Sequence, residues 1–367
     1  MSTIVFFCIP AYGHTNPTLG VVRELAARGH KVVYYSYDTM RKPIEAAGAA
    51  FVSCNAYDAE QRLSPKDGER LGRDLAFSTQ VLVDTTLALD NAILSDMRAL
   101  APDCIVADSM ALWGKLIAKK LDIPFVSSTT TFAFNRYSAK IMKQSPAQLF
   151  GMLVSMPKIG REIKRLQAAG YPVKSVLDII QNDENLDTIV YTSPEFQPCA
   201  DTFPAAHYAF VGPSIRPAEM RMEKSAQPLV YISLGTVVNN QLAFYQQCVA
   251  ALADGPCRVI LSIGEQVKPA ALGTLPGNVE VHAHVDQIAV LQIADVFLTH
   301  CGMNSASEAL YFGVPLVMFP QTPEQGGVCT RVLELGAGVK LDKPEAASIR
   351  KAIDKVLSSS TYREKAA

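Results

Sequence analysis

Short runs of apolar, β-branched and aromatic residues alternate along this chain with amphipathic stretches of helical length. Residues 3–9 (TIVFFCI) form the first run, residues 17–28 have the apolar spacing of a helix, and residues 31–35 form the second run. Runs as continuous as these are typical of strands buried on both faces of a parallel sheet that helices cover. The alternation therefore predicts an α/β fold.

The same alternation continues to the end of the chain, with one interruption. Further strands are expected at 103–107, 124–127, 229–233, 258–262, 279–285, 296–299, 316–319 and 338–341, and further helices at 113–121, 241–253, 305–312 and 346–357. A chain of 367 residues exceeds what one core usually serves. The polar, proline-bearing stretch 215–227 is the best linker, so we expect domains at 1–214 and 228–367.

Two such domains predict a pair of Rossmann-like sheets whose carboxyl ends face each other across a cleft, where ligands of α/β sheets bind. The formal net charge is −1 and no run of Lys and Arg stands out. Nucleic acid and stable membrane association are therefore not expected. The sequence G-x-G-x-x-G is missing at the first turn of each domain, which disfavours a dinucleotide-dependent oxidoreductase.

Cysteine usage and the N-terminus indicate the compartment. The eight cysteines are scattered without a C-x-x-C pair, as is typical of free thiols in a reducing compartment. The apolar N-terminal run has no preceding basic residue and is much shorter than a membrane span of ~20 residues. We therefore expect a cytoplasmic protein, either a monomer or a weak dimer.

The sequence VFLTHCGMNSASE in the second domain predicts an anion site. A buried strand ends at His300, Gly302 allows a tight turn, and Asn304 and Ser305 open a helix. Free amides and the helix dipole favour an anion at that turn. Two alternatives stay open here. Ser305 and Glu308 have the spacing of a capping box, and His300 could be a buried structural histidine.

The loop AYGHTNP after the first strand predicts a catalytic base. Gly13 permits a sharp turn, Pro17 suits the first position of a helix, and His14 is thereby presented at a strand end. An imidazole pKa near ~6.5 suits a general base, and a carboxylate must then orient the ring. Asp108 ends the strand DCIVAD and is the candidate, although it could instead cap the helix before Trp113.

Several motifs resemble those of one enzyme family. THCGMNSASEAL (299–310), FGVPLVMFPQ (312–321) and the pair Glu324–Gln325 resemble the nucleotide-sugar signature of the UDP-dependent glycosyltransferases with the GT-B fold. The likeness is greatest to the bacterial macrolide glycosyltransferases, in family 1. YISLGT (231–236) and G-H-x-N-P resemble the phosphate loop and the catalytic motif of that family, so the resemblance covers nearly the whole chain.

The resemblance implies a role for each matching residue. His14 would be the general base and Asp108 its partner. The UDP-sugar would be bound by Ser233, Gly235, Thr236, His284, Val285, Gln287, His300, Gly302, Asn304, Ser305, Glu308, Glu324 and Gln325. Within that set, Glu308 would bind the ribose, the pair at 324–325 the sugar hydroxyls, and His284 would lie where the family usually has a tryptophan under the base. The acceptor would contact Phe132, Phe134, Met142 and Met152.

The implied activity is the inverting transfer of a hexose, glucose being expected, from a UDP-sugar to a hydroxyl of a small hydrophobic acceptor such as a macrolide, a flavonoid or another phenol. No metal or other cofactor is expected, because D-x-D is missing and the pair His282-x-His284 lacks a third ligand. The alternatives are a nucleotide-sugar epimerase or lipid-precursor transferase on the same fold, and a non-catalytic nucleotide-sugar-binding protein. Family members continue with a helix that crosses back, so we expect a truncated chain or a shorter latch after Ala367.

Overall fold

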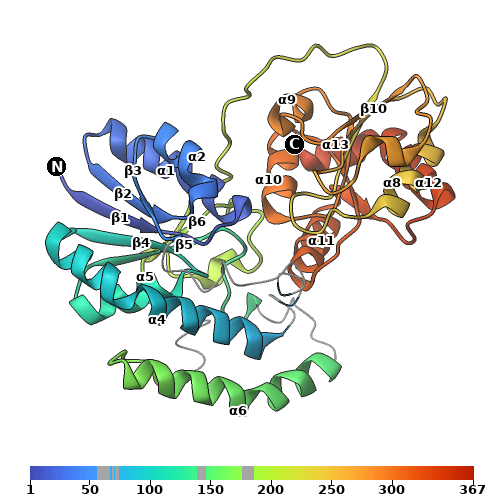
Figure 1. Cartoon of the computed structure of the whole chain (residues 1–367). Helices are drawn as coiled ribbons and strands as arrows, with labels where there is room; N and C mark the ends of the chain where they lie inside the picture. Colours follow the sequence, from blue (N-terminus) through green and yellow to red (C-terminus); the bar gives the residue numbers. More distant parts are fainter. Residues whose placement is uncertain (56–66, 68–69, 71–73, 139–145, 176–185) are drawn as a thin grey trace. The chain divides into compact units, whose positions relative to one another are not determined.

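The protein divides into two compact units, Met1–Ser214 and Ile215–Ala367. This computed structural model describes residues 1–55, 67, 70, 74–138, 146–175 and 186–367, without the side chains of 91 and 146–153. Each unit is built on its own parallel sheet (Figure 1), which confirms the predicted α/β class. The expected linker 215–227 belongs to the second unit, where Lys224 Nζ lies 2.8 Å from Asp295 Oδ1.

The sheet of the first unit has seven strands, all paired in parallel. Its order is β3 (Ala50–Ser53), β2 (Lys31–Ser36), β1 (Thr3–Phe7), β4 (Cys104–Asp108), β5 (Phe125–Thr129), β6 (Thr188–Val190) and β7 (Tyr208–Phe210). The order reverses direction at β1 and β4, which are neighbours. The carboxyl ends of these two strands are therefore the switch point at which ligands bind in such sheets.

Alternation along these strands explains why both faces of the sheet are covered. Phe6 and Tyr34 face a core shared with α1 (Tyr12–Ala27) and α2 (Arg41–Ala46). Phe7 and Tyr35 face the opposite core, which includes side chains of α4 (Leu75–Leu100) and α5 (Leu112–Leu121). A strand whose two faces are both buried reads as a continuous apolar run, as the sequence does here. The first unit also contains α6 (Pro146–Ala168).

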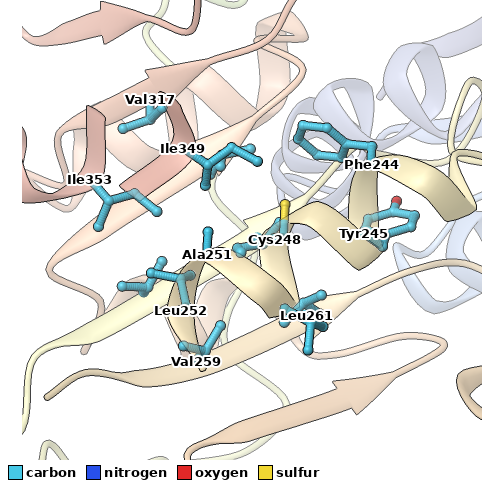
Figure 2. Close-up of a cluster of buried hydrophobic side chains, with 14 of the residues drawn as sticks. Phe244, Tyr245, Cys248, Ala251, Leu252, Val259, Leu261, Val317, Ile349 and Ile353 are labelled. Carbon is cyan, nitrogen blue, oxygen red and sulfur yellow. The ribbon is translucent and has the colours of Figure 1, made fainter. Parts of the chain in front are cut away.

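The sheet of the second unit has six parallel strands. Its order is β10 (Val279–His282), β9 (Arg258–Ser262), β8 (Leu229–Ser233), β11 (Val296–Thr299), β12 (Leu316–Met318) and β13 (Gly338–Lys340). Its helices are α8 (Leu242–Leu252), α9 (Gln287–Leu291), α10 (Met303–Tyr311), α11 (Pro323–Leu335), α12 (Ala346–Leu357) and α13 (Ser360–Ala366). Figure 2 shows α8 and α12 packed over one sheet face, where Cys248 and Ile349 meet Leu261 and Val317.

The start of α1 differs from the prediction. The helix begins at Tyr12 rather than Pro17, so Gly13 and His14 lie in its first turn and not in a loop. The reason is that the amides of His14 and Thr15 both donate to the Ala11 carbonyl, at 3.0 and 2.9 Å. That bonding closes a helical turn before Pro17, which then lies inside the helix although proline suits a first position best.

Within the described ranges, no helix is both long and apolar enough to cross a bilayer. Over the same residues, no group of three or more His, Cys, Asp or Glu side chains is placed to hold a metal ion.

Candidate catalytic pair and nucleotide-binding turn

The first unit brings the two predicted catalytic residues together. His14 lies in the first turn of α1, and Asp108 is the last residue of β4, the neighbour of β1. His14 Nδ1 is 2.9 Å from Asp108 Oδ2, and the carboxylate is buried. A carboxylate on Nδ1 favours a proton on that nitrogen and leaves Nε2 as the basic one. The pair therefore has the geometry of an oriented general base.

The second oxygen of Asp108 fixes the turn that follows the strand. Its Oδ1 accepts a hydrogen bond from the Met110 amide at 2.9 Å. Helix α5 begins at Leu112 after the N-cap residue Ala111, so the alternative role of Asp108 as the cap of that helix is wrong. One carboxylate thus organises its own loop and orients His14 at the same time.

Sequence reasoning missed a third residue at this pair. Thr130 directly follows β5, and its Oγ1 lies 3.1 Å from the same Nδ1 of His14. Its side chain is almost completely buried. The signal was the run Thr129–Thr131 at the end of a predicted strand, because polar residues at the ends of adjacent parallel strands converge.

The predicted acceptor residues do not share one environment. Phe132 is buried and packs on Phe196, with ring centroids 5.3 Å apart, so it is a core residue. Phe134 is exposed and remains available to a ligand. Met142 lies outside the described residues, and Met152 lies in α6 at a position whose side chain is not described.

In the second unit, the predicted anion turn follows β11, but the residue that makes the turn is not the expected one. Cys301 adopts the left-handed conformation, with φ of +64°, whereas Gly302 is extended at φ −65° and is the N-cap of α10. Glycine is required at 302 for space, because a Cβ there would lie 2.5 Å from His300 Nε2. The expected role of Gly302 in the turn is therefore wrong, and its role is to make room for His300.

A second glycine also lies close to the same ring. A Cβ on Gly235 would lie 2.6 Å from His300 Cε1, and Gly235 has a φ of +75° that favours glycine in any case. Burial lowers the pKa of His300 to about 4, against the opposing effect of a hydrogen bond with the Ser233 backbone. The imidazole is therefore neutral at pH 7, and an anion at this turn meets dipoles rather than a full positive charge.

The loop after β8 is closed by a hydrogen bond to the side chain of Ser233. Ser233 Oγ accepts a hydrogen bond from the Gly235 amide at 3.2 Å, while Thr236 is exposed. On the other side of His300, α10 presents Asn304 and Ser305 in its first turn. The N-terminus of α10 thus contributes amides and a positive dipole end, which favour an anion.

Glu308 is held by a hydrogen-bonded chain that the sequence did not predict. Gln287 Nε2 donates to Glu308 Oε2 at 2.5 Å, and Gln287 Oε1 accepts from the Tyr231 hydroxyl at 3.1 Å. Burial raises the pKa of Glu308, while this amide and the charge of Arg216 act in the opposite direction. The side chain of Gln287 is therefore used to orient Glu308, and the capping box of Ser305 with Glu308 is wrong, because α10 begins at Met303.

The capping box of this unit is found in the next helix. Thr322 Oγ1 accepts from the Gln325 amide, and Gln325 Oε1 accepts from the Gln321 and Thr322 amides at 2.7 and 3.2 Å. Glu324 lies beside it in the first turn of α11. The carbonyl oxygen of Gln325 is thus already paired, so its contribution to a ligand would come from its amide nitrogen.

The segment after β10 contains His284, the residue expected to lie under the nucleotide base. The strand ends at His282 and not at the expected residue 285, so His284 lies beyond the strand. His284 is 61% exposed at its side chain and its Nε2 lies 3.2 Å from Glu265 Oε1. Val285 follows it, half-buried. The His284 ring is therefore largely exposed, and its Nε2 lies beside a carboxylate.

Asp286 ties this segment to the start of the second unit. Its Oδ1 pairs with Arg216 Nη2 at 2.7 Å, and its Oδ2 accepts from the amides of Glu219 and Met220 at 2.5 and 3.2 Å. These hydrogen bonds and the charge of Arg216 hold the pKa of Asp286 below its usual value, although burial opposes them. Gln287, the next residue, is thereby anchored beside Glu308.

Solved structures define the class of this architecture. The kitacinnamycin glycosyltransferase superposes with a TM-score of 0.84 at 27% identity, and the calicheamicin glycosyltransferase CalG4 with 0.81 at 30% identity. Each alignment covers 100% of this chain and 92% of the other. The fold is therefore that of the GT-B glycosyltransferases, with two Rossmann-like domains.

Sequence relatives define the family within that class. Residues 246–367 match the erythromycin biosynthesis protein CIII-like C-terminal domain. The chain is 32% identical to an uncharacterized UDP-glucosyltransferase, YojK, of Bacillus subtilis, over 100% of this chain and 92% of that protein. It is 30% identical to the oleandomycin glycosyltransferase of Streptomyces antibioticus, over 94% and 80%. The chain belongs to the UDP-dependent, macrolide-type glycosyltransferases of family 1, enzymes that transfer a sugar from a nucleotide sugar.

Proposed function

We propose that this enzyme transfers glucose from UDP-glucose, with inversion, to a hydroxyl of a small hydrophobic acceptor such as a macrolide or a phenol. His14 acts as the general base and Asp108 as its orienting carboxylate. The observation that carries the proposal is the 2.9 Å contact between His14 Nδ1 and the buried Asp108 Oδ2. A partly exposed imidazole whose Nδ1 carries its proton toward a carboxylate has its basic lone pair on Nε2, the atom that takes the proton of an acceptor hydroxyl in this proposal.

The reaction is a single displacement at the anomeric carbon. The acceptor oxygen forms the new bond as its proton passes to Nε2 of His14, and UDP leaves with the electron pair of the broken bond. Because the acceptor attacks from the face opposite UDP, the configuration inverts. The imidazolium that forms is stabilised by the negative charge of Asp108, as in other bases paired with a buried carboxylate.

The second unit supplies the donor site in this proposal. The diphosphate accepts hydrogen bonds at the N-terminus of α10 and from the loop after β8, beside the neutral His300. Glu308 accepts hydrogen bonds from the ribose hydroxyls, and Gln325 donates to a sugar hydroxyl through its amide nitrogen. The exposed ring of His284 stacks on the base. No divalent ion is required, since amides and the helix dipole stabilise the leaving diphosphate.

UDP release with and without an acceptor tests the activity. UDP-glucose is mixed with the enzyme and with panels of macrolides and phenols, and the anomeric configuration of each product is read by NMR. We expect acceptor-dependent UDP release, a β-linked product, and an unchanged rate in EDTA. His14→Ala should reduce the rate by about a hundredfold or more while UDP still binds.

A matched histidine provides the control. His30→Ala removes an imidazole from the same unit, one whose Nδ1 accepts a hydrogen bond from the Ser2 amide at 3.3 Å, and it should leave the rate unchanged. A His14→Ala enzyme that keeps half of its activity at neutral pH would refute the assignment of the base. A product with retained configuration would refute the single displacement.

A further inference from the structure

Two oxygens, and not one, approach Nδ1 of His14. Asp108 Oδ2 is 2.9 Å and Thr130 Oγ1 is 3.1 Å from Nδ1. Both side chains are buried. An ionised carboxylate can only accept a hydrogen bond, so the proton of a neutral ring lies on Nδ1. The threonine oxygen is then a second acceptor for that N–H, a three-centre arrangement that is common in proteins.

The opposite arrangement is electrostatically unfavourable. If the Thr130 hydroxyl donated to a bare Nδ1, the lone pair of that nitrogen would also face the Asp108 carboxylate at hydrogen-bond distance. Repulsion of this kind is avoided when Nδ1 carries the proton. The same choice leaves Nε2 unprotonated, which is the state that a general base needs.

The backbone before Thr130 is fixed from both sides, which makes its hydroxyl a stable reference point. Strand β5 pairs with β4, with Ser128 opposite Asp108, and the Ser109 amide donates to the Ser128 carbonyl at 2.9 Å. On the other edge, the Tyr191 amide donates to the Thr129 carbonyl at 3.2 Å. The threonine that follows therefore has little freedom to move relative to the carboxylate.

We propose that Thr130 is a positioning residue for His14, holding the ring plane and the proton on Nδ1 so that Nε2 points its lone pair at the acceptor hydroxyl. This inference rests on the proposed role of His14 as the base. The contact with Asp108 constrains the rotation of the ring about its bond to Cβ from one strand end. The contact with Thr130 constrains the same rotation from a second strand end, and orientation of a reacting group contributes strongly to rate.

Replacing Thr130 by valine keeps the side-chain shape and removes the oxygen. We expect Thr130→Val to lower kcat by about tenfold, the scale of one hydrogen bond to a charged group, with both KM values unchanged. The acid limb of the pH–rate profile should move to lower pH by about half a unit. The reason is that an oxygen that accepts from Nδ1–H stabilises the protonated ring, so its loss lowers the pKa of the base.

Among the described residues, two other titratable groups interact electrostatically with Asp108, and neither titrates near neutral pH. Asp108 lies on β4, and near it are the Cys8 thiol beyond β1 and the Tyr191 hydroxyl beyond β6. Burial raises the pKa of both Cys8 and Tyr191, so each stays neutral while His14 titrates. The movement of the acid limb therefore reports His14.

Thr129→Val is the matched control, because the Thr129 hydroxyl is buried and has no hydrogen-bond partner within the described part of the chain. It should leave kcat and the pH profile unchanged, and Thr130→Ser should restore both. If Thr130→Val does not fold, Thr130→Ala and the imidazole ¹⁵N shifts of that variant give the same information, since the fraction of ring protonated on Nε2 should rise.

Comparing Thr130→Val in the wild-type enzyme and in the His14→Ala enzyme separates this inference from the proposed function. Thr130→Val should have no effect when added to His14→Ala, since a positioning residue acts only through the group it positions. Three results would each overturn the inference. They are a further loss of activity when Thr130→Val is added to His14→Ala, equal kcat and pH profile in Thr130→Val and Thr129→Val, and a Thr130→Ser enzyme that does not recover kcat and the pH profile. A His14→Ala enzyme that stays active would instead overturn the proposed function.

Discussion

The two units of this enzyme share a strand order over six strands, and they carry side chains of opposite character at the same position. In each sheet the order reverses between two neighbours, β1 and β4 in the first unit and β8 and β11 in the second. The strand β4 ends at the buried carboxylate Asp108, whereas β11 leads to His300, whose pKa is lowered to about 4. One switch point therefore carries a negative charge and the other a neutral ring.

The difference follows from what each strand end has to stabilise. In the proposed mechanism His14 becomes positive and needs a nearby anion, and Asp108 lies 2.9 Å from it. The proposed diphosphate site must avoid an anion, and His300 lies close to Gly235 and Gly302 beside a helix N-terminus. The scaffold supplies converging strand ends, and the residue at each end determines the sign of the charge that the unit can bind.

Asp108→Asn makes the first switch point neutral, like the second, and should have the largest effect. We expect kcat to fall by a hundredfold or more, because an amide cannot stabilise the imidazolium and can favour the wrong tautomer. The KM for the donor should stay constant. Asp103→Asn, which removes a charge at the opposite end of the same strand where Asp103 Oδ2 accepts the Thr3 amide, is the control. Equal losses in the two variants would contradict the comparison.

His300→Gln tests the claim that the second switch point holds a neutral ring. A pKa of about 4 in the folded protein, below the unfolded value of ~6.5, means that the unfolded chain binds more protons between these values. Stability is then fully present above pH 6.5 and is lost as the pH falls toward 4. Between pH 7.5 and 5, the wild-type free energy of unfolding should fall by about 2 kcal/mol more than that of the variant.

Urea unfolding followed by circular dichroism at the two pH values measures this difference. The only tryptophan, Trp113, lies in the first unit, so its fluorescence follows the other half of the chain. His282→Gln, at an exposed histidine of the same unit, should behave like the wild type. An equal pH dependence in wild type and His300→Gln would show that the buried ring is not neutral.

Gln287→Leu tests whether the second unit orients its ligand groups by amides, as the first orients its base by a carboxylate. Loss of the 2.5 Å bond from Gln287 Nε2 to Glu308 Oε2 should raise the donor KM by about tenfold. The pKa of Glu308 should rise further, so the loss should be greater at pH 6 than at pH 8. Gln292→Leu, at the exposed end of α9, should not change the KM. Equal KM values for the two variants would exclude the role of Gln287.

His284→Trp should have the smallest effect and the opposite sign. An indole offers more stacking area than an imidazole, and a stacked base is worth ~1–3 kcal/mol in single-strand binders. The larger ring should therefore lower the donor KM by about two- to threefold, with kcat nearly unchanged. His284→Trp also removes the contact with Glu265, and the variant Glu265→Gln measures the effect of that loss on the donor KM by itself. A raised KM in a folded His284→Trp enzyme would mean that this position does not lie at the base.

The sequence predicted which polar residues follow the buried strands. It predicted only some of the contacts that these residues make with one another. The apolar runs locate His14, Asp108 and His300 because each polar residue follows a buried strand, and ligands bind at that edge. Thr130 was missed because its contact with His14 spans 116 positions, and no local pattern encodes it. Gln287 was expected only as one of the UDP-sugar-binding residues, because its partners Tyr231 and Glu308 become visible only once three elements are packed together.

Helix starts and long buried helices were the other failures. The start of α1 depends on two amides that share the Ala11 carbonyl, which a rule about Pro17 does not anticipate. Helix α4 was not predicted, because its 26 residues include several β-branched side chains that favour strands in isolation. Burial of its Leu89 and Ile93 against the first sheet outweighs that preference.

The two glycines that flank His300 make this turn a source of non-additive substitutions in any mutant library. Gly302 has an ordinary backbone conformation and excludes larger residues only because the ring is there. A smaller residue at 300 would therefore make Gly302→Ala tolerable, so the pair should show positive epistasis. Gly235 has a φ of +75° and stays restricted whatever residue is at 300. Selection experiments on this enzyme should thus find 300 and 302 changing together, with 235 held constant.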